Sequence, residues 1–197
     1  GSVRIDQGPL RIKAIVAYFA PRPNKAKELS AWNVGCKKLM EWVAKQVKET
    51  ATRVTPILFT DANSGFKTDG ESDEKVCGPF HGNNEGLVGR LLREWMSVVE
   101  FTPLDSWYDI GPTFWGPNGR SKPDHILCPG SLRNKVKKCE VWHATARNVR
   151  FRPRFVDHLP IVVTLDIPPP NRHVPTRAKR WDHQKLAACL QKGEGRR

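Results

Sequence analysis

One segment constrains the fold more than any other, because in residues 54–63 an apolar run ends abruptly in polar residues. Residues 57–59 predict a buried strand, and Asp61 and Asn63 follow it two residues apart. In open α/β sheets, ligands bind at the carboxyl ends of strands. An Asp and an Asn there can hold a divalent ion, a phosphate oxygen or an attacking water. The alternative is an Asx turn, which these residues often form after a strand.

The preceding residues predict a β-α-β unit. Residues 10–18 alternate and then become apolar, which is typical of a strand that becomes buried on both faces. Tyr18 lies near the end of this strand, and taken alone it is most simply an ordinary half-buried aromatic. Apolar residues at helical spacing predict a helix from Lys25 to near Thr50, with Asn24 as its cap. A helix joining two strands indicates a parallel or mixed pair.

The rest of the chain predicts a second helix over residues 84–98 and then several short strands separated by Gly-Pro turns. The predicted strands cover residues 100–102, 113–115, 123–127, 138–142 and 159–167. This order indicates a mixed-sheet α/β sandwich. Residues 168–175 are a stiff proline-rich linker, so we expect one domain over 3–167 and a linker with a basic tail over 168–197.

The charge is distributed unevenly along the chain. The net charge is +13, and residues 1–130 carry 17 basic and 15 acidic side chains, so 11 of the 13 excess positive charges follow residue 130. This asymmetry indicates a polyanionic partner, DNA or alternatively RNA, contacted mainly by the C-terminal part. The alternative is a basic surface that is merely solvated.

The five cysteines include no C-x-x-C pair, which favours free thiols in a reducing compartment over a zinc site. No apolar run approaches the roughly 18 residues needed to span a membrane, so we expect no membrane partner. An intracellular, nuclear protein is the location that these features favour.

Further polar residues lie near predicted strand ends. Asp124 lies in the strand over 123–127, and Asp157 and His158 immediately precede the last strand. Each has a simple alternative explanation as a helix cap, a turn residue or a member of a surface pair. Together with Tyr18 and Asp61 they form a candidate site spread over about 140 residues of sequence.

Four arginines precede this last group: Arg147, Arg150, Arg152 and Arg154. The even spacing of the last three places them on one side of an extended chain. We interpret the four as a ridge that contacts nucleic-acid phosphates beside the site. The alternative is an edge strand protected by its charge.

Four motifs resemble those of the endonuclease/exonuclease/phosphatase superfamily, which has the DNase I-like fold. Residues 17–21 resemble the family's strand that ends in Tyr and Pro, and residues 59–63 resemble its Gly-Asp-Phe-Asn motif. Residues 123–127 are similar to its Ile-Asp-Tyr-Ile-Leu strand, and residues 156–160 to its closing Ser-Asp-His-Arg-Pro motif. The order and spacing of the four motifs match the family, which makes the resemblance specific.

A narrower resemblance points to the endonuclease domains of non-LTR retrotransposons. It rests on the Asn-x-x-Gly segment within residues 78–86, on residues 91–95 and on the Thr-Phe-Trp-Gly-Pro segment at 113–117. In that family the basic tail would lead toward a reverse transcriptase domain.

The resemblance implies hydrolysis of DNA phosphodiesters with a divalent metal, normally Mg²⁺ and alternatively Mn²⁺. His158 would be the general base or a cation that holds the scissile phosphate, and Asp124 would fix its tautomer. Asp61 would orient or deprotonate the attacking water, and Asn63 would position water and phosphate. Tyr18 would contact the phosphate.

The resemblance also places Asp157 beside the metal. The family's main metal ligand is a Glu on an earlier strand, preceded by a strand with an Asn, and this sequence has no counterpart of either before residue 10. The missing part would be lost, supplied by a separate chain, or removed by truncation. A sheet without its first strands would expose an edge and favour self-association.

The sequence therefore predicts a DNase I-like α/β sandwich that lacks its first strands and acts as a metal-dependent DNA-nicking endonuclease. One alternative is a catalytically impaired, basic nucleic-acid-binding remnant of that fold. Another is a phosphatase or lipid phosphodiesterase of the same superfamily, which the basic tail and the narrower motifs disfavour.

Overall fold

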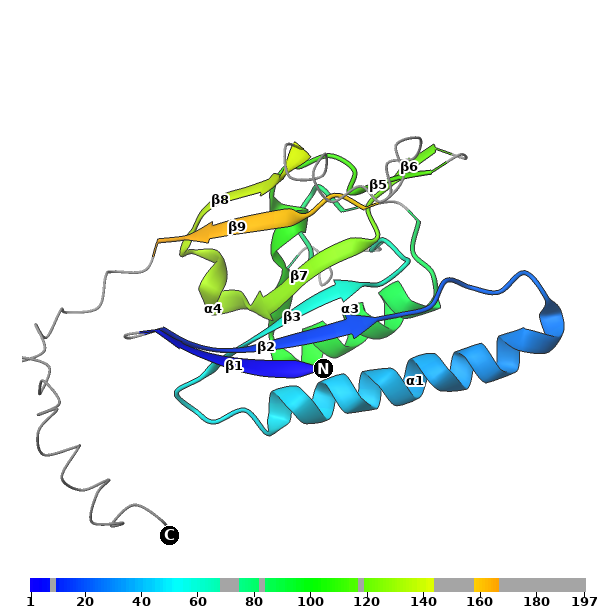
Figure 1. The fold of residues 1–197 in the computed structure, drawn as a ribbon, viewed down its shortest axis with the longest axis horizontal. Helices are drawn as coiled ribbons and strands as arrows, with labels where there is room; N and C mark the ends of the chain where they lie inside the picture. The colour runs from blue at the N-terminus through cyan, green and yellow to red at the C-terminus, as the bar shows by residue number, and fades with distance from the viewer. Residues whose placement is uncertain (8–9, 68–74, 82–83, 117–118, 144–157, 167–197) are drawn as a thin grey trace, which may run out of the picture.

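The computed structural model describes residues 1–7, 10–67, 75–81, 84–116, 119–143 and 158–166. Its centre is a five-stranded mixed sheet in the order β1-β2-β3-β7-β4 (Figure 1). These strands are β1 (Ser2–Gln7), β2 (Leu10–Tyr18), β3 (Thr55–Asp61), β7 (Asp124–Pro129) and β4 (Phe101–Pro103). The predicted mixed α/β fold is therefore confirmed.

Two helices cover one face of the sheet, and a separate pair of strands covers part of the other face (Figure 1). The helices are α1 (Ala26–Lys48) and α3 (Leu87–Val99), and the strand pair is β8 (Val136–Val141) with β9 (Ile161–Leu165). The smaller elements are a 3-10 turn η1 (Leu104–Trp107), a hairpin of β5 (Phe114–Gly116) and β6 (Gly119–Ser121), and α4 (Gly130–Arg133). Neither α1 nor α3 has the length and apolar character that crossing a membrane requires.

Strand pairing brings the candidate residues to one edge of the sheet. β2 and β3 run parallel, as predicted, with Tyr18 beside Asp61. β7 runs antiparallel to β3 and places Asp124 beside Asp61. Residues paired in this way point to the same face of a sheet, so the three side chains share one face at one edge.

Helix α1 buries the stripe expected from its apolar spacing, with Cys36, Met40 and Val43 at the centre. Its expected cap is wrong. Lys25 still has an extended backbone and is the N-cap residue, so Asn24 precedes the position from which a side chain bonds the first turn. The helix therefore gains its stability from packing against the sheet rather than from capping.

The two faces of the sheet have separate cores. Toward the helices, Ile15, Leu58 and Leu127 pack in one cluster with residues of α1 and α3. Toward β8 and β9, the sheet residues Ile57 and Ile126 pack in a second cluster. Neighbouring residues of β3 thus enter different cores, as the alternation of side chains along a strand requires.

The strand pair leaves half of its face of the sheet uncovered. Five exposed apolar side chains lie there: Val3 (58%), Ile5 (46%), Val16 (57%), Tyr18 (61%) and Phe59 (37%). The expectation that residues 10–18 become buried on both faces is therefore wrong at the end of β2. The edge strand β1, which carries two of the five, was not predicted, although its apolar residues alternate with Arg4 and Asp6 as in a half-buried strand.

Helix α3 begins three residues later than predicted, because its start is fixed by a distant side chain. The Ser64 hydroxyl accepts hydrogen bonds from the N–H groups of Gly86 (2.8 Å) and Gly89 (3.2 Å). The buried face of the helix contains Val88, Leu92 and Met96, whereas Val98 near its end is 81% exposed.

Gly89 is the point where α3 approaches the loop that follows β3. A Cβ atom at this position would collide with the Gly65 carbonyl oxygen and the Ser64 hydroxyl. We expect Gly89→Ala to lower the free energy of unfolding by about 1–3 kcal/mol, despite the better helix propensity of Ala. Urea denaturation followed by circular dichroism measures this loss.

Gly35 provides the matched control, because it lies in α1 with nothing within 4 Å of a Cβ atom. Gly35→Ala should raise the free energy of unfolding by up to about 1 kcal/mol through helix propensity alone. Equal effects of the two substitutions would contradict the close approach at Gly89.

Candidate functional site

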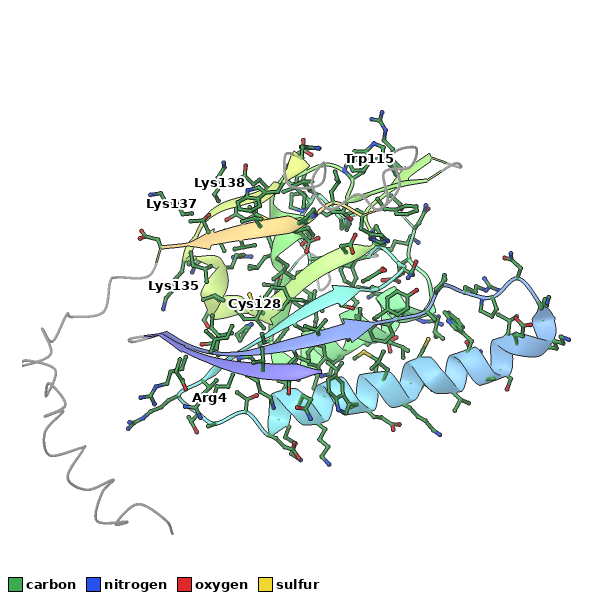
Figure 2. All side chains as sticks on the ribbon, viewed as in Figure 1. Arg4, Trp115, Cys128, Lys135, Lys137 and Lys138 are labelled. Atoms are coloured by element: carbon green, nitrogen blue, oxygen red, sulfur yellow. The ribbon has the colours of Figure 1, made fainter. Side chains whose placement is uncertain are left out.

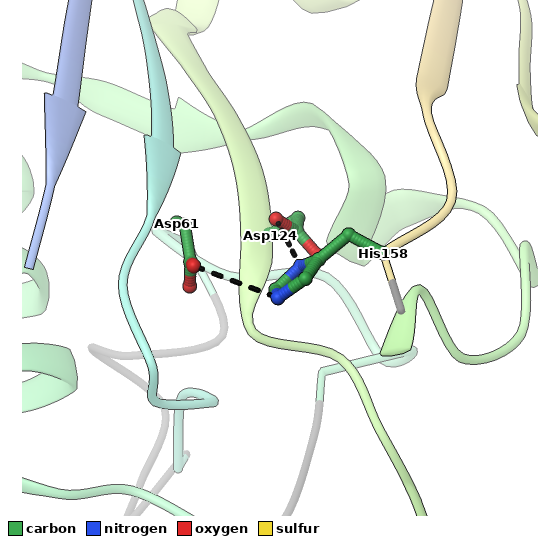
Figure 3. Close-up of side chains that lie close together, drawn as sticks. All are labelled: Asp61, Asp124 and His158. Carbon is green, nitrogen blue, oxygen red and sulfur yellow. Dashed lines mark hydrogen bonds and ion pairs between the residues drawn. The ribbon is translucent and has the colours of Figure 1, made fainter. Parts of the chain in front are cut away.

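Asp61, Asp124 and His158 meet at the edge where β2 and β3 end (Figure 3). The His158 Nδ1 atom lies 3.0 Å and 2.8 Å from the two carboxylate oxygens of Asp124. Its Nε2 atom lies 3.7 Å from Oδ2 of Asp61. The three residues thus offer ligand or proton-transfer atoms within 4.8 Å of one another.

Strand β5 positions the histidine and its partner. Phe114 pairs with His158 through a β-bridge, and their rings are 4.9 Å apart between centroids. The wholly buried Thr113 donates its hydroxyl to Oδ2 of Asp124 at 2.7 Å, and its carbonyl accepts the Leu159 N–H at 2.7 Å. Thr113 and His158 thus hold the Asp124 carboxylate between them. Because this carboxylate accepts from Nδ1 of His158, the proton of the neutral ring stays on Nδ1. In the neutral ring, Nε2 therefore carries the lone pair, and it lies 3.7 Å from Oδ2 of Asp61.

Asp61 forms a turn and belongs to the site as well. Its Oδ1 atom accepts the backbone N–H of Asn63 at 3.0 Å, which is an Asx turn, while Oδ2 faces His158. Asn63 has a left-handed backbone (φ 46°) and donates its side-chain amide to the Phe19 carbonyl at 2.8 Å. The two alternatives drawn from the sequence are therefore both present, because the turn is what aims Asp61.

Burial raises the pKa of the Asp61 carboxyl group above its ordinary value. The Asn63 N–H opposes this shift, the nearby Asp124 carboxylate adds to it, and the charges of His158 and His125 oppose it. Two carboxylates on adjacent strands repel each other, so ionisation of Asp61 is less favourable than that of an isolated Asp in water. This brings Asp61 closer to the pKa of a useful proton acceptor.

The site opens into a cavity of about 340 Å³. One wall is the loop of residues 63–65 with Asn84, and another is the β5–β6 hairpin, which contributes Phe114 and Arg120. His158 lies in the lining, so its imidazole is accessible from the cavity. Arg120 contributes positive charge at this wall and lies 5.9 Å from the ring of Trp115.

A buried ionic network supports the floor of the site. Asp105 is fully buried, and its carboxylate lies 2.9 Å from Nδ1 of His125 and 3.4 Å from the Lys122 amine. Nε2 of His125 donates to the Ser64 carbonyl at 2.9 Å. The imidazole is thus held between the Asp105 carboxylate and the Ser64 carbonyl. The network joins β7 to the loop that carries Asn63.

The surroundings of Asp105 keep it ionised. Burial alone would raise the pKa of this carboxyl group, but the charge and hydrogen bond of His125, the Lys122 ammonium and the Ile126 N–H hold it below its ordinary value. No pattern in the sequence indicates this network, because its members are single polar residues without periodicity. Thr113 was recognised only as part of a motif, and its bond to Asp124 was not foreseen.

The other predicted site residues are placed as follows. Tyr18 lies beside Asp61 on the same face and is exposed, which is compatible with contact to a ligand. Asp157 and the arginines Arg147, Arg150, Arg152 and Arg154 lie outside the described residues. Lys135, Lys137 and Lys138 follow the far end of β7 and thus lie at the end of the fold opposite the site (Figure 2).

The donor set at the site fits a divalent cation only in part. Mg²⁺ prefers carboxylate oxygens and water, and Asp61 supplies a carboxylate oxygen that faces the site. The oxygens of Asp124 are engaged by Thr113 and His158. Among the described residues, Asp61 is therefore the carboxylate best placed to hold Mg²⁺ or Mn²⁺.

The fold is the DNase I-like fold, as the sequence motifs predicted. A TRAS1 endonuclease domain, from a telomere-specific non-LTR retrotransposon, superposes with a TM-score of 0.57 at 16% identity. The 3′ phosphatase NExo from Neisseria, bound to a product DNA hairpin, gives 0.54 at 12% identity. An AP endonuclease from Archaeoglobus fulgidus gives 0.52 at 15% identity.

These matches cover 85%, 84% and 84% of this chain, and 63%, 65% and 65% of the three neighbours, in the same order. The chain thus spans slightly less than two thirds of their length. At such low identities the likeness shows the fold alone. Comparison of the sequence with family models and with curated proteins finds no match.

The raised pKa of Asp61 predicts a stability difference that depends on pH. The folded state binds the Asp61 proton more tightly than the unfolded state, so this group destabilises the fold above its folded pKa and ceases to do so as pH falls through it. Asp61→Asn should therefore melt at a higher temperature than the wild type at pH 7. The difference should shrink toward pH 4 in thermal scans.

Asn at position 61 can still accept the Asn63 N–H, so the turn is preserved in this variant. The exposed Asp109→Asn is the control and should show no comparable pH-dependent gain. A lower melting temperature for Asp61→Asn at pH 7 would contradict the assigned cause of the shift.

The buried network predicts a large cost when its anion is removed. Asp105→Asn keeps the shape of the side chain but leaves His125 and Lys122 without a counter-charge. We expect a loss of about 3–5 kcal/mol in the free energy of unfolding, measured by urea denaturation. Asp109→Asn should change it by less than about 0.5 kcal/mol, as exposed positions do. Similar losses at the two positions would contradict the network's role.

Proposed function

We propose that this protein is a metal-dependent hydrolase of DNA phosphodiesters that nicks DNA in the manner of retrotransposon endonucleases. The observation that carries the proposal is the Asp124–His158 pair, whose second ring nitrogen, Nε2, faces Asp61 beside a cavity that His158 lines. The structural neighbours support it, because they include a retrotransposon endonuclease domain, an AP endonuclease and a phosphatase bound to DNA.

In this proposal Asp61 accepts the proton of the attacking water. Its Oδ2 atom faces the open site, and its raised pKa makes it a better base than an ordinary carboxylate. The Asx turn holds the carboxylate in place, so little reorganisation accompanies the reaction.

His158 stabilises the phosphate in the same proposal. When protonated, it presents Nε2–H to a non-bridging oxygen while Asp124 balances its charge at Nδ1. The amide of Asn63 has a second N–H beyond the one bonded to Phe19, and this N–H can reach the same phosphate. Tyr18 would contact a phosphate oxygen from the adjacent strand end.

A divalent cation held at Asp61, Mg²⁺ or Mn²⁺, would neutralise charge on the non-bridging oxygens. Asp157, expected from the sequence to lie near that cation, is outside the described residues. The residues of this chain would supply the base, the cationic donor and the orientation of the phosphate.

A second candidate function is a DNA-binding module with impaired catalysis. One observation favours it, namely that the described part of the site holds few available carboxylate oxygens. Thr113 and His158 engage the oxygens of Asp124, which leaves Asp61 as the available carboxylate among the described residues. Proteins usually bind Mg²⁺ through one or two carboxylates together with substrate phosphates, so a single carboxylate makes cation binding depend on the phosphate of the substrate.

Nicking of supercoiled plasmid with Mg²⁺ or Mn²⁺ tests the proposal. Wild type should convert supercoiled plasmid to open circles, and Asp61→Ala and His158→Ala should each lower the rate by about 100-fold or more. Asp109→Ala is the matched control, since it removes an exposed carboxylate at a position outside the cavity lining.

The outcomes separate the two candidates. Full nicking by the two site variants would place the activity elsewhere. If the wild type does not nick DNA but still binds it with strong salt dependence, the second candidate, a DNA-binding module, is supported.

A further inference from the structure

A second cavity, of about 430 Å³, adjoins the loop that leaves the site. Arg22 contributes from the segment between β2 and α1, and Trp32 and Asn33 contribute from α1. Gly86 and Arg90 line it from the start of α3. These residues come from three separate segments, so the cavity is a product of the tertiary fold.

The cavity carries an uncompensated positive charge. The acidic residue in its lining, Glu85, is bonded by the Arg93 guanidinium at 2.8 Å and 3.1 Å, and both side chains are nearly buried. Arg22 and Arg90 are exposed and form no ion pair with the described residues. Two guanidinium groups therefore face this cavity without a counter-charge from the part of the chain that the structure describes.

The wall that carries Arg22 is fixed in place. The Trp32 indole donates to the Ala20 carbonyl at 2.8 Å, which ties the segment carrying Arg22 to α1. Guanidinium groups pair with phosphate oxygens through two parallel hydrogen bonds, and a fixed backbone reduces the cost of ordering them. The chemistry of the cavity thus suits a phosphate group rather than an apolar ligand.

The two cavities share a wall. Asn84 lines the first cavity, and the next two residues, Glu85 and Gly86, line the second. Arg22 also follows Tyr18 by four residues, at the strand end that lies beside Asp61. The wall therefore extends from the cavity that His158 lines to the cavity of Arg22 and Arg90.

We propose that the Arg22–Arg90 cavity binds a second phosphodiester of the DNA strand whose scissile phosphate lies in the first cavity. This inference rests on the proposed function and names the subsite that fixes the position of the strand. The subsite contacts the sugar-phosphate backbone, so it contributes affinity without reading sequence.

Salt-dependent DNA binding tests this subsite. A fluorescein-labelled duplex of about 20 base pairs is titrated at several NaCl concentrations in EDTA, where binding is measured without cleavage. Arg22→Ala with Arg90→Ala should weaken binding to all sequences alike and reduce the slope of log K against log salt by about 1. Arg53→Ala is the matched control, because Arg53 is exposed at the opposite end of β3.

A second pair of variants tests the cavity without removing either arginine. Asn33→Glu places a carboxylate in the lining and should weaken binding, whereas Ala31→Glu adds the same charge on another side of α1. Both positions are exposed on a helix that tolerates Glu, so both variants should fold. Asn33→Glu should lower the affinity at least threefold more than Ala31→Glu.

Each outcome bears on a different proposal. If the wild type binds DNA and the double arginine variant has the same affinity and the same salt slope, the proposed subsite is wrong. The proposed function is not affected by that result. An equal loss with Arg53→Ala or Ala31→Glu also overturns the subsite, because general charge would then explain binding. A wild type that binds no DNA at low salt overturns both proposals together.

Discussion

The pairing of β3 with β7 is the constraint on which the site depends. It places Asp61 directly beside Asp124, so two carboxylates share one edge of a sheet and repel each other. The fold offsets this repulsion with polar groups from elsewhere. Thr113 and His158 engage Asp124, and the Asn63 N–H engages Asp61. The sheet therefore fixes the positions of the two carboxylates, and loops and short strands supply the hydrogen-bond donors that stabilise them.

A buried group of polar side chains stabilises the same part of the sheet. Asp105, His125 and Lys122 lie under the loop that carries Asn63, and each polar atom of the Asp105 carboxylate has a partner. A satisfied buried network of this kind is rigid, because breaking any one bond leaves a charge unpaired in a medium of low dielectric constant. The buried network behind the residues that face the cavity thus helps to fix their positions.

The sequence predicted those parts of the fold that carry a repeating pattern. The β2-α1-β3 unit follows from its spacing, and the motifs around Asp61 and Asp124 predicted the DNase I-like fold. The contact between Ser64 and His125 joins residues 61 positions apart, and no periodicity marks either one. The cavity of Arg22 and Arg90 was missed for the same reason: ordinary surface arginines become neighbours only once the chain is folded.

The half of the sheet face that β8 and β9 leave uncovered combines an apolar surface with a strongly basic chain. Val3, Val16 and Phe59 present an apolar surface, and a net charge of +13 keeps two such surfaces apart. Salt at about 0.1 M reduces the reach of that repulsion to about 10 Å. Ionic strength thus acts in two directions, since salt that would weaken contacts with the proposed DNA partner would also let two apolar faces approach each other.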